Sequence, residues 1–267
     1  MGESANSRMH CAPVVTSGEA RGTLVVGVAF EFAMWIEKES GLGVSAPTAV
    51  GILLLSVLLL AGLIFVPAGR LDWTAGWLCL AAMVIGFSAV TAHVAMRTPS
   101  LIRRRVKVGA GTPLWDRIVV SFFQLTFVAI LVVGGLDAGR YRWTFLPHWL
   151  QGVGLILMAA ASLILGWAMG CNPHFEATVR IQRDQGHRVI DSGPYRIVRH
   201  PGYVAGIALL VGMALVLGSA WALVPALLGT IAMVVRTALE DAFLIEHLDG
   251  YRAFTDRTPF RLIPGMW

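Results

Sequence analysis

Six long apolar segments constrain this chain more than any other feature of its sequence. A helix needs about 20 mostly apolar residues to cross the hydrocarbon core of a bilayer, and each segment reaches or approaches that length. The segments are Ala46–Val66, Trp73–Met96, Ile118–Leu136, Leu150–Gly170, Tyr203–Ala220 and the first part of Trp221–Leu248. Tryptophans at their ends, such as Trp149 and Trp221, are typical of side chains that anchor a helix at the membrane surface. The pattern predicts an all-α integral membrane protein with about six transmembrane helices.

A seventh apolar segment, Thr23–Ile36, is shorter and contains Glu31. It is too short to cross the hydrocarbon core comfortably, so we expect an interfacial helix that lies on the membrane. The chain then divides into an N-terminal cytoplasmic segment, residues 1–45, and a membrane domain, residues 46–267.

The basic residues gather in the segments between the apolar ones. Only 14% of the residues are charged, against about 25% in soluble domains, and the net charge is +5. Arginine and lysine concentrate in Arg97–Arg117, in Asn172–Gly202 and in the C-terminal tail. The positive-inside rule places these segments and both termini in the cytoplasm, which explains the charge without a nucleic-acid partner. We therefore expect the active site at the cytoplasmic face.

The three cysteines lack the paired spacing that is typical of zinc sites. No metal site is expected from the sequence.

The segment Gly193–Tyr203, with the sequence GPYRIVRHPGY, places a cationic loop directly before an apolar helix. Its Gly-Pro pair predicts a turn, and Pro201 biases His200 toward an extended conformation. The loop therefore brings His200 and Tyr203 to the mouth of the helix bundle. Its arginines are equally consistent with a role as lipid anchors that reach toward anionic headgroups.

The last apolar segment, Trp221–Leu248, is too long for a simple span. As one helix it rises about 42 Å at 1.5 Å per residue, whereas the hydrocarbon core is about 30 Å thick. Its C-terminal third therefore projects into the cytoplasmic interface. Arg236 and Glu240 share a face there, and Asp241 lies one position round. The set is consistent with an ordinary charged helix end, but charged groups near membrane depth tend to be functional.

The loop and the stretches RTALED and LIEHLDGYRAFTDRTPFRLIP together resemble the isoprenylcysteine carboxyl methyltransferase family. They equally resemble the wider group that includes bacterial phospholipid N-methyltransferases. The resemblance covers about Asn172 to Pro264, and TPSLIRRRVKVGAGTPLWDRIV is similar to the central cytoplasmic loop of the bacterial members. Two positions depart from the family pattern. The acidic pair is Glu240-Asp241 where Glu-Glu is usual, and Phe254-Thr255 stands where a tyrosine often occurs.

The resemblance implies a methyltransferase that holds S-adenosylmethionine with residues of about 172–264. The carboxylate of this cofactor suits arginine or histidine donors, and its ammonium suits a carboxylate. The residues expected to bind it are Tyr195, Arg199, His200, Pro201, Tyr203, Glu240 and Asp241.

Arg236 and Glu240 are the expected catalytic residues. We expect Arg236 to pair with Glu240 at rest and to clamp an anionic acceptor during turnover. Glu240 would act as a base if the acceptor were an amine. The residues expected to contact the acceptor are Arg236, Tyr251 and Arg257.

The membrane setting predicts a lipophilic acceptor that enters between helices. It would present the carboxylate or thiol of a prenyl-type or other lipid-like molecule, with a phospholipid amine as the alternative. We expect an integral protein of a bacterial inner membrane.

Two other functions stay open at this stage. Membrane reductases of sterol or enone type, which use NADPH, have a similar late Arg-His-x-x-Tyr loop. They typically carry Asn-Tyr in place of Pro-Gly-Tyr, and they lack the acidic pair. In a non-enzymatic carrier or assembly protein the charges would only set topology. A carrier should also show internal pseudo-symmetry, and the sequence has no repeated segment.

Overall fold

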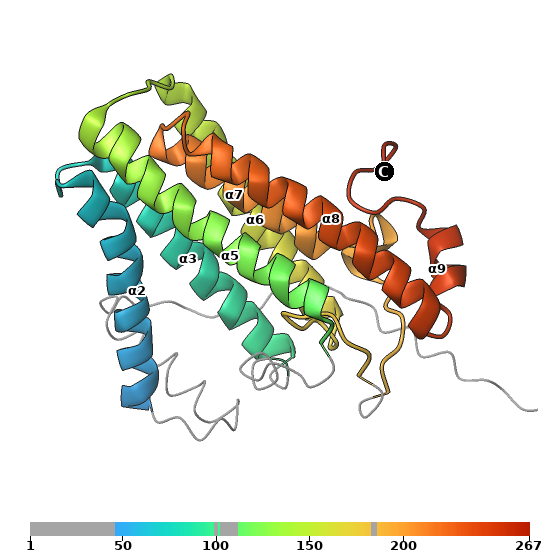
Figure 1. The fold of residues 1–267 in the computed structure, drawn as a ribbon. Helices are drawn as coiled ribbons and strands as arrows, with labels where there is room; N and C mark the ends of the chain where they lie inside the picture. The colour runs from blue at the N-terminus through green and yellow to red at the C-terminus, as the bar shows by residue number, and fades with distance from the viewer. Residues whose placement is uncertain (1–45, 99–100, 102–111, 183–185) are drawn as a thin grey trace, which may run out of the picture.

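The described part of the chain is a helix bundle (Figure 1). It comprises residues 46–98, 101, 112–182 and 186–267 of the computed structural model. No strand occurs in these ranges, which confirms the all-α class for them. The predicted interfacial helix at Thr23–Ile36 lies outside the described residues. The elements are α2 (Ala46–Ala68), α3 (Thr74–Arg97), α5 (Leu114–Gly134), η1 (Gly135–Tyr141), α6 (His148–Cys171), η3 (Gly193–Arg196), α7 (Pro201–Leu217), α8 (Leu223–His247) and α9 (Tyr251–Arg257).

Five of these segments are long and apolar enough to cross a membrane. They are Val50–Ala68, Thr74–Arg97, Leu114–Tyr141, His148–Cys171 and Leu223–His247. The sixth predicted span, α7, has 17 residues and rises only about 26 Å, so its role as a span stays a prediction. Exposed aliphatic side chains such as Leu58 and Leu163 cover the bundle, as they do on surfaces that face lipid. The described helices therefore fit an integral membrane protein.

The helices begin and end close to their predicted positions, with one informative difference. α5 begins at Leu114 and continues through the π-helical turn η1 as far as Tyr141, whereas the sequence predicted Ile118–Leu136. Asp116 and Asp137, which the sequence assigned to loops, therefore lie near the two ends of one continuous helix. Both side chains are fully buried.

α6 and α7 touch through their backbones. A Cβ atom added at Gly154 would lie 2.7 Å from the carbonyl oxygen of Gly212, and one added at Gly212 would lie 2.9 Å from that of Gly154. Small residues permit this close approach of two helices in lipid. Met158 and Met213 continue the contact in the apolar core. α7 is thereby held against α6, which fixes Pro201 and the loop before it.

One end of the bundle, called here the Asp137 end, is closed by a buried carboxylate. Asp137 accepts hydrogen bonds from the backbone N–H of Thr144 at 2.8 Å and from its hydroxyl at 2.5 Å. The hydroxyl of Ser219 donates to it at 2.6 Å. These bonds join η1 to the segment before α6 and to the turn between α7 and α8. Exposed aromatic side chains in the same segments match interfacial anchors; they are Tyr141, Trp143, Trp149 and Trp221.

Candidate active site

The loop Gly193–Tyr203 lies at the opposite end of the bundle, called here the site end, where α8 leads into α9 (Figure 1). The loop begins with η3, in which Gly193 has φ +61°. A Cβ atom there would also lie 2.6 Å from Sγ of Cys171, so only glycine fits. Tyr195 is buried, and its hydroxyl accepts a hydrogen bond from Nδ2 of Asn172 at 3.1 Å. Burial raises the pKa of Tyr195, so this hydroxyl stays protonated at neutral pH. These contacts seat the loop on the end of α6.

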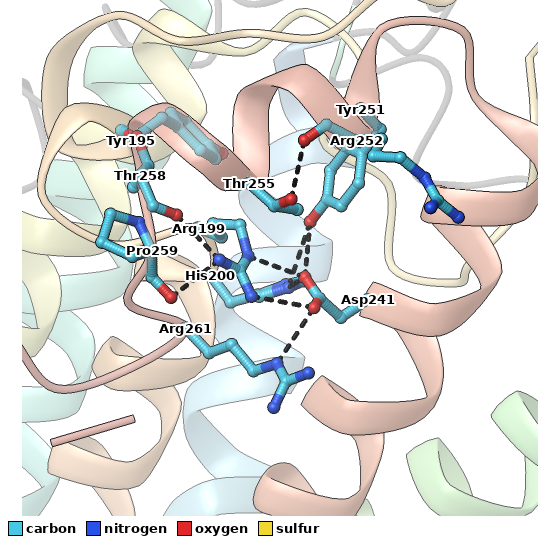
Figure 2. A network of polar contacts seen from close by, with 10 residues as sticks. All are labelled: Tyr195, Arg199, His200, Asp241, Tyr251, Arg252, Thr255, Thr258, Pro259 and Arg261. Carbon is cyan, nitrogen blue, oxygen red and sulfur yellow. Dashed lines mark hydrogen bonds and ion pairs between the residues drawn. The ribbon is translucent and has the colours of Figure 1, made fainter.

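Asp241 is the centre of a buried polar network at the site end (Figure 2). Arg199 donates to it through Nε and Nη2, both at 2.9 Å, and Arg261 donates through Nε at 2.9 Å. The hydroxyl of Tyr251 donates to it at 2.9 Å, and Nε2 of His200 lies 3.2 Å away. The network joins α8, the loop, α9 and the C-terminal tail.

Arg199 is also tied to the tail. Its Nη1 donates to the carbonyl oxygens of Thr258 at 2.7 Å and Pro259 at 2.8 Å. Its backbone N–H donates to the carbonyl oxygen of Phe260 at 2.9 Å. Arg199 and Asp241 thus hold the loop, the helix and the tail together, and a direct contact of either with a cofactor stays a prediction.

Tyr203 links the loop to the charged face of α8. Its ring stacks on that of His200, with the two centroids 5.5 Å apart. Its hydroxyl donates a hydrogen bond to the carboxylate of Glu240. The guanidinium carbon of Arg236 lies 5.0 Å from the centre of the same ring, which is within the range of a cation–π interaction. The structure therefore brings four of the predicted residues side by side.

The expected resting pair of Arg236 with Glu240 is wrong, because Arg236 pairs with Asp116. Nε of Arg236 donates to Oδ1 of Asp116 at 2.8 Å, and Nη2 donates to the carbonyl oxygen of Ala177 at 2.8 Å. Oδ2 of Asp116 accepts the backbone N–H of Val179 at 2.8 Å. Sequence reasoning missed Asp116 because its partner lies 120 positions away. The available signal was an acidic residue at the start of an apolar segment.

A cavity of about 600 Å³ reaches this cluster from between the helices. Its apolar part is formed by α3, α5, α6 and α7, and the side chains there include Met83, Val90, Phe127, Met158, Leu165 and Leu209. Its polar part is lined by Tyr195, Arg199, His200, Pro201, Tyr203, Arg236, Glu240 and Tyr251. An apolar pocket with a few convergent polar groups is the usual form of a small-molecule site. This one suits a molecule with a polar head and an apolar chain.

Two of the predicted site residues do not line the cavity. Asp241 lies behind the lining, within its network. The side chain of Arg257 is 59% exposed and pairs at 3.0 Å with Asp191, which is 57% exposed. The structure therefore does not bring Arg257 to the cluster around Tyr203.

The segment between α6 and η3 also lines the cavity; it falls within the predicted cofactor-binding region, although none of its residues was among the predicted site residues. The rings of His174 and His187 lie 4.7 Å apart there. Gln182 joins them: its side-chain amide donates to the carbonyl oxygen of His174 at 2.9 Å, and its backbone N–H donates to Nδ1 of His187 at 3.3 Å. Burial and then the neighbouring His174 lower the pKa of His187 to about 4, so its ring is neutral at pH 7.

Within the described ranges, no group of three or more histidine, cysteine or acidic side chains is arranged to hold a metal ion.

Comparison with known proteins bears on the same region. Residues 149–249 match the family model of phospholipid methyltransferases. The matched region runs from α6 through the loop and α8, so it includes His200, Tyr203, Arg236 and Glu240. No curated protein matches the chain. This match confirms the resemblance found in the sequence: residues 149–249 are similar to the phospholipid methyltransferase family, which is part of the superfamily that includes the isoprenylcysteine carboxyl methyltransferases.

Proposed function

We propose that this protein transfers a methyl group from S-adenosylmethionine to an acceptor with a lipid-like chain. The family match supports the methyltransferase class. The observation that carries the lipophilic acceptor is the two-part cavity, in which an apolar region between helices leads to His200, Tyr203, Arg236 and Glu240. A small soluble acceptor would need no such apolar region.

The polar part of the cavity offers the groups that S-adenosylmethionine needs. This molecule carries one carboxylate and two cationic centres, so a site with surplus negative charge suits it. Glu240 accepts the hydroxyl of Tyr203 and has no ion-pair partner among the described residues. We assign the ammonium to Glu240 and the carboxylate to His200, with Tyr195 and Pro201 as walls of the same region.

When bound, S-adenosylmethionine supplies a methyl group on a sulfonium sulfur. Arg236 contributes by aligning the lone pair of the acceptor with that methyl carbon, and Glu240 contributes by holding the ammonium of the donor. The bond between the acceptor and that carbon would form as the carbon–sulfur electron pair returned to sulfur. Such an in-line displacement depends on alignment and on the removal of water. Arg236 is only 8% exposed, so the site is largely shielded from water.

An anionic acceptor, such as a carboxylate or thiolate, would bind to Arg236. A guanidinium has five N–H donors. Asp116 takes the one on Nε and the carbonyl of Ala177 takes one on Nη2. The other three donors, including both on Nη1, have no hydrogen-bond partner among the described residues and are available to an acceptor. Tyr251 lies in the same polar part of the cavity.

A phospholipid amine is the second candidate acceptor. Glu240 favours it, because this carboxylate has no ion-pair partner in the described ranges and can hold an amine and take its proton, in which case it would not hold the ammonium of the donor. Residues four apart on a helix are neighbours. A zwitterionic headgroup could therefore place its phosphate on Arg236 and its amine near Glu240.

We also propose that α7 is a sixth span and that the site end faces the cytoplasm of a bacterial inner membrane, together with both termini. The arginine-rich segments at this end support the assignment. A cysteine introduced at Gly186 should react only with reagents that enter the cytoplasm. A cysteine at Phe145, which is 80% exposed in the Asp137 end, should react from outside. Labelling of Gly186→Cys in intact cells by an impermeant reagent would overturn this orientation.

The test of function is a titration of the purified full chain in lipid nanodiscs. S-adenosylmethionine and NADPH are titrated side by side, and methyl transfer from labelled donor is then measured with prenylcysteine and phosphatidylethanolamine acceptors. We expect donor binding and labelled lipid product. Binding of NADPH alone would favour the membrane reductase instead, and binding of neither would favour a carrier.

A further inference from the structure

We propose that Asp116 is a positioning residue for methyl transfer. It holds the guanidinium of Arg236 away from Glu240 and turns the free edge of that guanidinium into the cavity. The proposal rests on the proposed function, because it assigns a role to the same site. Asp116 itself does not line the cavity, so it acts through Arg236.

The two oxygens of Asp116 have separate partners. Oδ1 accepts Nε–H of Arg236 and Oδ2 accepts the backbone N–H of Val179, both at 2.8 Å. The carboxylate is fully buried. It therefore joins α5 to α8 and to the segment that lines one wall of the cavity.

Three contacts fix the plane of the Arg236 guanidinium. Asp116 holds Nε, the carbonyl oxygen of Ala177 holds Nη2, and the ring of Tyr203 lies beneath the cation. A planar fork held in this way points Nη1 in a fixed direction. Its donors have no partner in the part of the chain that the structure describes, so an acceptor oxygen or sulfur can bind there. Lysine has no such fork, and its ammonium could rotate.

Asp116 also decides which acid neutralises Arg236. Glu240 lies one turn further along α8, at the spacing that favours an ion pair between arginine and glutamate. Without the charge of Asp116, a buried guanidinium is costly unless it finds another carboxylate. Arg236 would then move toward Glu240. Arg236 and Glu240 would then bind each other, and neither would be available to a ligand in the cavity.

The experiment uses Asp116→Asn in the full chain, with Asp137→Asn as the matched control. Both positions are fully buried aspartates on the same helix. We expect Asp116→Asn to lower single-turnover methyl transfer by about ten- to a hundredfold. We expect Asp137→Asn to leave that rate within about twofold at 25 °C.

The decisive readout is the double variant. If Asp116 acts through Arg236, then Asp116→Asn should cause no further loss of turnover in the Arg236→Ala background. Multiplied losses, or a normal rate for Asp116→Asn alone, would overturn the proposal. Should Asp116→Asn fail to fold, Asp116→Glu keeps the charge but displaces it, and the same double-variant comparison applies. Absence of methyl transfer by the parent would instead refute the proposed function.

Discussion

Asp116 and Asp137 are both fully buried, and they lie roughly 30 Å apart along one helix, by the rise per residue. Their partners differ. Within the described part of the chain, the side chain of Asp137 accepts hydrogen bonds from neutral donors: the backbone N–H and hydroxyl of Thr144, the hydroxyl of Ser219 and the backbone N–H of Trp221. Asp116 forms an ion pair with Arg236, which lines the cavity.

The difference separates two uses of a buried carboxylate in a membrane protein. At the Asp137 end, neutral donors surround the charge, and the network has no contact with the cavity. At the site end, the ion pair includes Arg236, which lines the cavity and has N–H donors without a hydrogen-bond partner in residues 46–98, 101, 112–182 and 186–267. The first arrangement can only contribute to stability. The second can contribute to catalysis as well. Substitutions at the two ends test this difference, and they are given from the largest expected effect to the smallest.

Asp241→Ala should lower the free energy of unfolding by about 3–5 kcal/mol, because it leaves Arg199 and Arg261 buried or half-buried without their carboxylate. Unfolding in mixed micelles measures this. Asp191→Ala is the matched control, since its pair with Arg257 is exposed and should contribute at most about 1 kcal/mol. Equal small losses for both variants would contradict the central role of Asp241.

Arg236→Ala should lower turnover by about a hundredfold or more while donor affinity is preserved, because alignment losses are of that order. Arg236→Lys should not restore the rate, since it loses the planar fork. Single-turnover transfer and donor titration measure the two quantities separately. Arg70→Ala, which removes an exposed pair with Asp72, is the control. A normal rate for Arg236→Ala would show that the arginine is only a helix-end charge.

Asp137→Asn should lower the free energy of unfolding by about 1–3 kcal/mol, because the bonds to Thr144 and Ser219 lose a charged acceptor. Turnover at 25 °C should stay unchanged. The measurement pairs a thermal melt with the transfer assay. A large loss of turnover at unchanged stability would mean that the Asp137 end also communicates with the site.

The smallest expected effect is a pH dependence at His187. The pKa of His187 is about 4 in the fold and about 6.5 in an unfolded chain. Above about pH 6.5 the ring is neutral in both states and does not lower the free energy of unfolding. As the pH falls toward 4, protonation of the unfolded chain lowers this free energy. Between pH 7 and pH 5, the melting temperature of the parent should fall more than that of His187→Gln. The ionisable groups that act on it are His174, Glu176 and Arg180. Parallel curves for parent and variant would show that the pH dependence does not arise from His187.

The spans could be predicted because each requires only a local property, an apolar run of sufficient length. The loop that holds His200 and Tyr203 was also predictable, since Gly193 and Pro201 impose their conformations locally. What the sequence could not provide was the pairing of charges. Arg236 had an acid four residues away, yet it binds Asp116 from another helix.

The same limit explains the other differences. Arg199 and Asp241 were predicted to bind a cofactor, and that role stays a prediction; the sequence did not indicate that their side chains bind each other at 2.9 Å. Arg257 was expected near the acceptor, but the fold carries it to an exposed surface. Which charges neutralise one another depends on the packing of elements distant in sequence, and no local pattern records that.

The attachment of the tail to the loop has a consequence for biosynthesis. The backbone N–H groups of Arg199 and His200 donate to the carbonyl oxygens of Phe260 and Arg261 at 2.9 and 3.0 Å, and Arg261 also binds Asp241. Chains are made from the N-terminus onward, so these carbonyls emerge from the ribosome after all the helices that line the cavity. The cavity walls can therefore assemble in the bilayer before Phe260 and Arg261 are made, and the contacts of these two residues with the loop form afterwards.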